Sequence, residues 1–113
     1  MKFTINKKEY EAHYSFRMLM LYEQIQGKTI DFQNITLNDL VLLFYTCVIS
    51  TLQYNKANYT MGYEDFLNWL DDNEGEKKIV EFTNWYVQEL KIKEDLASPK
   101  KDEPNDLNLD PNF

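Results

Sequence analysis

The stretch TINKKEYEAHYSFRMLMLYEQIQG, residues 4–27, changes its hydrophobic period part-way along, and this change decides the fold. Its first part alternates apolar and polar side chains on both sides of the short polar link Asn6-Lys7-Lys8. Two alternating runs joined in this way predict a β-hairpin with one apolar face. That face consists of Phe3, Ile5, Tyr10, Ala12 and Tyr14. We expect the rest of the protein to cover it.

From Ser15 onward the period becomes that of a helix. Ser15 is a suitable N-cap, and Gly27 is a suitable C-terminal stop. The apolar stripe at i, i+3, i+4 and i+7 comprises Met18, Leu21, Tyr22 and Ile25. A neighbouring face adds Phe16, Leu19 and Met20. A helix that is apolar over so much of its circumference is typical of one covered on more than one side.

Three more helices are expected downstream. Thr36 and Asp39 match a capping box at the start of the most apolar segment, LNDLVLLFYTCVISTLQY, residues 37–54. The apolar run in this segment is shorter than a bilayer span and contains hydroxyl side chains, so we do not expect it to cross a membrane. A short helix is expected from about Met61 to Asp71 with Thr60 as its cap, and a last helix from about Glu74 to Lys93.

The predicted fold class is therefore mainly α with a short N-terminal β-hairpin (α+β), in a small helical bundle of about four helices. A chain of 113 residues with 43% hydrophobic and 27% charged side chains has room for one domain. The segment EDLASPKKDEPNDLNLDPNF holds all three prolines and has six acids against two lysines, with no clear period. We expect a folded domain over residues 1–93 and a disordered, acidic, proline-containing tail over residues 94–113.

Charge and composition exclude several classes of function. The formal net charge of −7 and the pI near 4.6 oppose binding to nucleic acid or to an anionic membrane surface. Cys47 is the only cysteine, and the N-terminus does not resemble a secretory signal, so we expect a cytoplasmic protein. His13 falls on the polar side of the hairpin, and Cys47 lies within an apolar helix, where it should be inert.

The acidic residues near Asn73 lack the ligand spacing of a calcium loop, and the chain has no glycine-rich phosphate loop. No pair of residues resembles a nucleophile with its base. We therefore expect a non-enzymatic protein without a catalytic site, metal or cofactor.

The helices carry more apolar surface than a domain of this size comfortably buries, which indicates a protein partner or a self-contact. The expected interaction residues are Phe16, Leu19, Met20, Leu42, Leu43, Phe44, Ile49, Trp69 and Trp85. The pattern does not say which face of the helix over residues 37–54 closes the core and which receives a partner. Leu43 and Phe44, about 100° apart on the helix, are therefore expected to separate these two roles.

The order of these signals resembles that of the tail assembly chaperones of long-tailed bacteriophages (siphoviruses). FTINKKEY, residues 3–10, is similar to the hairpin F-T-I-N-G-K-E-Y of that family, with Lys7 in place of glycine. Three further segments resemble the family in the same order: YSFRMLMLYEQIQGK with an aromatic residue and an arginine near its start, IDFQNITLNDLVLLFYTCV, and the acidic and aromatic YEDFLNWLDD. The likeness covers roughly residues 3–90.

The resemblance implies a scaffold made in the cytoplasm of the infected bacterium and absent from the mature virion. Chaperones of this family coat the long tape-measure protein and recruit tail-tube subunits around it. A longer form made by ribosomal frameshifting often carries an additional C-terminal domain. We accordingly expect the tape-measure and tail-tube proteins as partners, together with self-association into a homo-oligomer.

A second interpretation remains open. A small acidic phage or bacterial protein could inhibit a host protein by binding it in place of a nucleic acid. Such a protein should carry its acids clustered on one folded face, and much of the excess negative charge here lies in the last twenty residues.

Overall fold

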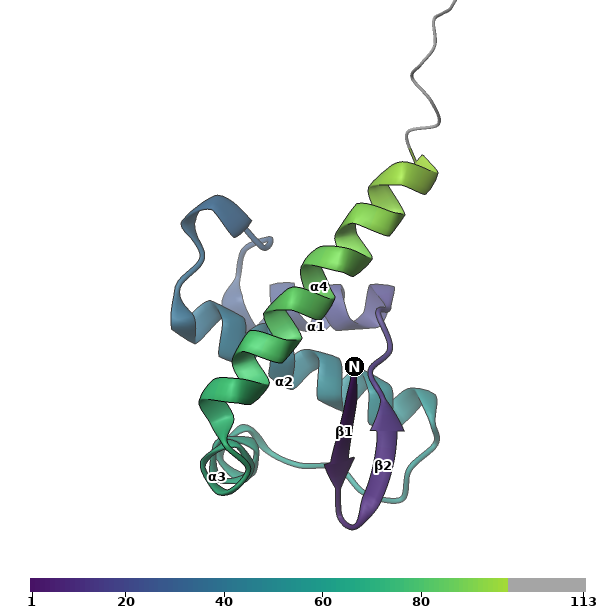
Figure 1. Ribbon diagram of the computed structural model, residues 1–113, viewed down its shortest axis with the longest axis vertical. Helices are drawn as coiled ribbons and strands as arrows, with labels where there is room; N and C mark the ends of the chain where they lie inside the picture. The colour runs from purple at the N-terminus through teal and green to yellow at the C-terminus, as the bar shows by residue number, and fades with distance from the viewer. Residues whose placement is uncertain (98–113) are drawn as a thin grey trace, which may run out of the picture.

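The computed structural model describes residues 1–97, and the remainder of the expected tail, residues 98–113, lies outside the described residues. It is mainly helical with an N-terminal two-stranded hairpin, which confirms the predicted fold class (Figure 1). The elements in chain order are β1 (Lys2–Ile5), β2 (Lys8–Glu11), α1 (Phe16–Gln26), the short 3₁₀ helix η1 (Phe32–Asn34), α2 (Leu37–Tyr54), α3 (Tyr63–Asp72) and α4 (Gly75–Ala97).

The hairpin forms, with Asn6 and Lys7 of the polar link as a two-residue turn and Lys8 as the first residue of β2. β1 and β2 are antiparallel, with Phe3 opposite Tyr10 and Ile5 opposite Lys8. Asn6 and Lys7 have φ angles of 53° and 67°, so both occupy the left-handed region, as a type I′ turn requires. The apolar side chains Phe3 and Ile5 are each 2% exposed. The hairpin face predicted to be covered is thus buried by the helices.

Lys7 provides a direct test of this turn. A non-glycine residue in the left-handed region costs about 1–2 kcal/mol, and glycine removes that cost while adding freedom to the unfolded chain. We expect Lys7→Gly to raise the free energy of unfolding by about 0.5 kcal/mol, measured by urea denaturation. Lys56→Gly, at another left-handed position with φ 54°, should behave likewise. A clear destabilisation by Lys7→Gly would show that the lysine side chain holds the turn.

Trp69 of α3 covers the outer edge of the hairpin. Its indole Nε1 donates a hydrogen bond of 2.9 Å to the carbonyl oxygen of Thr4, and its ring meets Phe3 edge to face at 6.4 Å. An uncovered strand edge is a template for pairing with another chain. The indole therefore occupies a carbonyl that an added strand would otherwise use.

The predicted caps of α1 and α2 are confirmed. Ser15 Oγ accepts a hydrogen bond from the backbone N–H of Met18, and Gly27 ends α1 with φ 79°. Thr36 and Asp39 form a complete capping box at the start of α2, since each side chain accepts from the other's backbone N–H. These hydrogen bonds lower the pKa of Asp39, the largest contribution coming from the Thr36 N–H. Local sequence therefore fixes where both helices begin.

The start of α3 and the end of α4 differ from the prediction. Thr60 does not cap α3, which begins at Tyr63 after the N-cap Gly62. Met61 stays outside the helix because its side chain is buried and its carbonyl accepts a 2.9 Å hydrogen bond from Tyr45 Oη. α4 begins at Gly75, where a Cβ would approach the Leu70 carbonyl oxygen to 3.0 Å. α4 then continues to Ala97, past the expected end of the domain at residue 93.

α2 is the central helix of the core. α1, α4 and β2 all pack against it. Phe44 lies at the middle, stacked on Phe82 at 4.7 Å and edge to face with Phe66 at 5.3 Å. By length and composition α2 also satisfies the criteria for a membrane span, with a mean hydropathy of 1.2, but 56% of that segment is buried inside the domain. A buried core helix meets the same criteria, so this finding is no sign of a membrane.

Candidate protein-binding surface

Three of the predicted interaction residues belong to the core. Leu42 is 6% exposed, and Leu43 and Phe44 are completely buried. The expectation that they contact a partner is therefore wrong, and so is the expectation that Leu43 and Phe44 serve different roles. The reason is that neighbouring elements cover α2 on several sides, so that both of its apolar faces are used within the monomer.

Three more of these residues are half-buried and lie apart from one another. Trp69 covers the hairpin edge. Trp85 of α4 packs against Tyr14 and Phe82, with ring centroids 6.4 Å and 5.8 Å away. Ile49 of α2 packs against the core. These side chains complete the fold and do not form a common surface.

The remaining three do lie together, on the outer side of α1. Phe16 is 77% exposed and Met20 is 45% exposed, while Leu19 is half-buried beside them. We call Phe16, Leu19 and Met20 the α1 face. Beside it lies a hollow of about 270 Å³, lined also by Tyr22, Glu23, Thr29 and Ile30. The α1 face is thus an apolar projection next to an apolar depression.

A second depression follows the other side of α1, where this helix crosses the C-terminal part of α2. It consists of two hollows of about 600 and 410 Å³ that share Phe16, Arg17 and Gln53. We call it the α1–α2 groove. Its lining is made of His13, Ser15, Phe16, Arg17, Met20, Leu21, Gln24, Ser50, Gln53 and Tyr54.

Arg17 and Gln53 join the two walls of this groove. The guanidinium Nη1 of Arg17 donates a hydrogen bond of 3.0 Å to Gln53 Oε1, and both side chains are exposed. At one end of the groove the ring of His13 stacks on Tyr54 at 3.9 Å, while the His13 backbone N–H donates to Thr51 Oγ1. The segment between β2 and α1, together with α1 and α2, therefore contributes to one surface.

Sequence reasoning found the α1 face but missed Arg17, Gln53 and Tyr54. Phe16 and Met20 are four residues apart and lie off the buried pair Met18 and Tyr22, which is a signal for an unburied apolar face. Gln53 is thirty-six residues from Arg17 in the chain, so only the packing of α1 on α2 brings the two together.

Other exposed apolar side chains are distributed along α4. Val80, Val87, Ile92 and Leu96 are 45–75% exposed, and charged residues stand between them. The C-terminal part of α4 extends beyond the rest of the domain (Figure 1). Val80 lies in a shallow depression of charged and amide side chains, Glu76, Lys77, Glu81 and Asn84. Phe16 and Met20 differ from these side chains in lying together beside the hollows that α1 forms with its neighbours.

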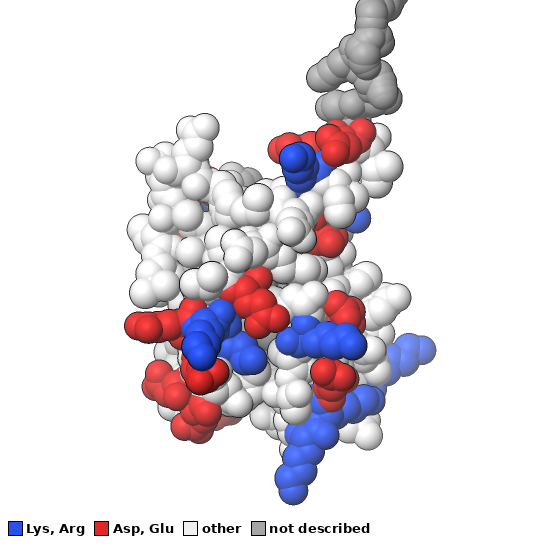
Figure 2. All heavy atoms as spheres, in the orientation of Figure 1, with Lys and Arg blue, Asp and Glu red and all other residues white. Residues whose placement is uncertain are grey.

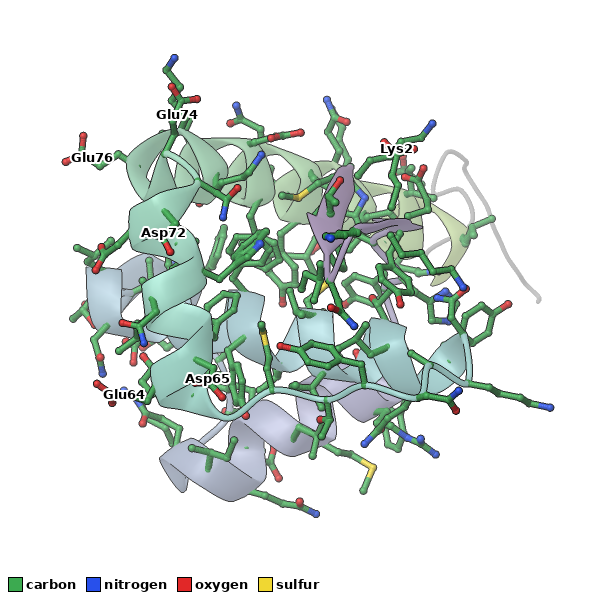
Figure 3. All side chains as sticks on the ribbon, turned by 90° about the horizontal axis from the view of Figure 1, so that it is seen from below. Lys2, Glu64, Asp65, Asp72, Glu74 and Glu76 are labelled. Atoms are coloured by element: carbon green, nitrogen blue, oxygen red, sulfur yellow. The ribbon has the colours of Figure 1, made fainter. Side chains whose placement is uncertain are left out.

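The charges are unevenly placed. Acidic side chains gather over α3 and the start of α4, and lysines gather over the hairpin (Figure 2). The acids Glu64, Asp65, Asp72, Glu74 and Glu76 stand outward on this side of the domain (Figure 3). Lys77 forms the one ion pair found there within residues 1–97, at 3.5 Å from Glu74. None of the lining residues of the α1–α2 groove is acidic.

The remaining candidates for chemistry are the thiol of Cys47 and the side chains that could bind a metal. Cys47 is completely buried in α2, and burial raises the pKa of its thiol to about 12, which keeps it neutral and unreactive. Within residues 1–97, no three metal-ligating side chains gather closely enough to hold an ion.

No protein-family model, curated protein or solved structure matches the chain.

Two buried tyrosines predict how the domain responds to alkaline pH. Tyr22 and Tyr86 are 1% and 0% exposed, and burial is the main cause that raises the pKa of both phenols above the usual 10. The folded state favours the neutral form of both phenols. The contribution of these two side chains to stability is therefore complete below pH 10 and is lost as the pH rises through the raised pKa. We expect the free energy of unfolding to fall above pH 10 by up to about 1.4 kcal/mol per pH unit for Tyr86.

Urea denaturation at several pH values measures this slope, with Tyr86→Phe as the control that removes one of the two groups. Tyrosinate absorbance of both buried rings should rise only together with loss of the native circular dichroism signal. Ionisation of both rings in a chain with native circular dichroism would contradict the burial argument.

Proposed function

We propose that this protein is a non-enzymatic tail assembly chaperone of a long-tailed phage or prophage. It binds the tape-measure protein and helps to recruit tail-tube subunits. The proposal draws on the resemblance described above and on one observation, the exposed apolar face of α1. Phe16 has 77% of its surface in contact with solvent, on a helix that begins with a well-formed cap.

An exposed apolar helix face beside a groove is suited to binding a second helix. Amphipathic helices are commonly recognised when their apolar side enters such a groove. Complete burial of a phenylalanine or methionine side chain contributes about 1.5–3 kcal/mol each. Phe16 and Met20 can therefore contribute to a reversible contact, as an assembly chaperone needs.

The charge distribution is compatible with this role. A group of acids lies over α3 and the start of α4, on other elements than Phe16 and Met20. A chaperone bound to a long apolar client keeps it soluble by presenting a charged outer surface. In this proposal the protein acts in the cytoplasm of the bacterial host, forms homo-oligomers along its client and leaves before the virion matures.

Co-expression tests the proposal. The gene that directly follows that of a tail chaperone should encode a very long helical tape-measure protein. A fragment of that protein should be insoluble when it is expressed alone, and soluble and co-purified when it is expressed with this chain. A fragment that stays insoluble in the presence of the folded chain, with none co-purified, would contradict the proposal.

A second candidate function has one observation in its favour. The acids on α3 and at the start of α4 form the kind of folded acidic side expected of a protein that replaces nucleic acid on a host partner. In that case neutralising acids such as Glu64 and Asp72 would abolish the activity, and changes on the α1 face would leave it intact. The tail chaperone is favoured because the apolar surface of α1 would have no role in the alternative.

A further inference from the structure

We infer that the α1–α2 groove binds an apolar helical segment that carries a carboxylate, and that Arg17 is the partner of this carboxylate. The inference rests on the proposed function, because the groove shares Phe16 and Met20 with the α1 face. It adds the chemistry by which one client helix is preferred over another.

The first step is the state of Arg17. Its guanidinium is exposed, and its one side-chain hydrogen bond within residues 1–97 goes to the neutral amide of Gln53. The ion pairs of the described chain involve the N-terminus, Lys28 and Lys77, but not this arginine. A guanidinium has five N–H donors in a planar fork that matches a carboxylate. Most of its donor capacity is therefore free for a ligand.

The second step is the charge of the groove. The chain has a net charge of −7, yet the ten residues that line the groove include Arg17 and no aspartate or glutamate. Arg17 would attract an acidic segment, and no acidic residue in the lining would repel it. A basic segment would be repelled by Arg17. The groove is thus complementary to negative charge, although the whole chain has a net charge of −7.

The third step is the apolar part of the groove. Phe16, Met20 and Leu21 line one wall on α1, and Tyr54 lies at the far end. Apart from Arg17 and His13, the remaining lining side chains are hydroxyl and amide groups. An occupant that buries apolar side chains against α1 therefore brings any charge at its edge close to Arg17. This combination describes an amphipathic helix with an acidic residue beside its apolar stripe.

Three synthetic helices serve as probes. They share one apolar stripe and carry Glu, Gln or Lys at a single central position beside it. Their affinities for the full chain are measured by fluorescence anisotropy at low and high salt. We expect the Glu probe to bind about tenfold more tightly than the Gln probe. The Lys probe should be the weakest, and only the Glu probe should weaken markedly as salt is added.

Variants of the chain assign the preference to Arg17. Arg17→Gln should bind the Glu and Gln probes equally, and Arg17→Glu should bind the Lys probe best. Lys77→Gln removes a cation from α4, outside the groove, and should keep the wild-type order of affinities. Circular dichroism checks that each variant is folded.

The outcomes separate this inference from the proposed function. If all three probes bind wild type equally and Phe16→Asp abolishes all of that binding, the carboxylate preference is wrong and the apolar surface stands. If no probe binds wild type, the groove does not receive such a helix and the inference fails. If instead light scattering finds a dimer that Phe16→Asp dissociates, the occupant is a second copy of this chain.

Discussion

The variant Phe44→Asp is expected to be unfolded in water at room temperature. Phe44 is completely buried and stacks on Phe82 in the middle of the core. A buried unpaired charge costs several kcal/mol in addition to the lost packing, and a domain of this size has a total stability of about 5–15 kcal/mol. The milder Phe44→Ala should lower the free energy of unfolding by about 3–5 kcal/mol. Circular dichroism and urea denaturation measure both effects.

Leu37→Asp is the matched control on the same helix. Leu37 is 67% exposed at the first turn of α2, where an acidic side chain also suits the helix dipole. This variant should fold normally. Leu43→Asp should unfold like Phe44→Asp, since Leu43 is equally buried. A folded Phe44→Asp with a cooperative transition would show that α2 is not the centre of the core.

The double variant Phe16→Asp, Met20→Asp is expected to fold normally and to lose its client. Both side chains are exposed in the monomer, so charges placed there remain hydrated. In a complex the same charges would be buried without partners, and truncating even one central apolar contact of an interface costs about 2 kcal/mol or more. We expect affinity for the tape-measure fragment to fall about 100-fold or more.

Val80→Asp on α4 is the control for this change. Val80 is 60% exposed and stands among charged side chains, so the variant should keep both its fold and its client. If the double variant binds as tightly as wild type, the α1 face is not the client site. If Val80→Asp abolishes binding instead, the site lies on the outer side of α4.

The sequence predicts the elements whose signals are local. The hairpin follows from alternation around Asn6-Lys7-Lys8, although Lys7 is an unusual residue for the left-handed turn that it adopts. α1 and α2 begin where Ser15 and Thr36 provide side-chain caps. α3 was predicted two residues too early, because the hydrogen bond from Tyr45 to Met61 is a tertiary contact that no local pattern contains.

The candidate site was predictable only in part, because some of its contacts are tertiary and leave no local pattern. Periodicity places Phe16 and Met20 outside the predicted stripe of α1, but of that stripe only Met18 and Tyr22 are buried, and Ile25 is 55% exposed. The expectation that α1 is covered on more than one side is wrong, because this helix packs mainly on α2.

On α2 periodicity fails, since apolar side chains point in several directions and most of them are covered. Only Leu37 and Tyr54, at the two ends of the helix, are largely exposed. The sequence could not place Gln53 beside Arg17, because this neighbourhood depends on how α1 crosses α2.

Hydrogen exchange of the full chain, alone and bound to the tape-measure fragment, tests the central claim most directly. The exposed groups of α1 and the C-terminal end of α2 lie at the proposed contact, and α3 lies elsewhere. The account predicts that binding slows exchange in α1 and around Gln53 and leaves the amides of α3 unchanged. Slower exchange over α3 and the start of α4, with α1 unaffected, would contradict it.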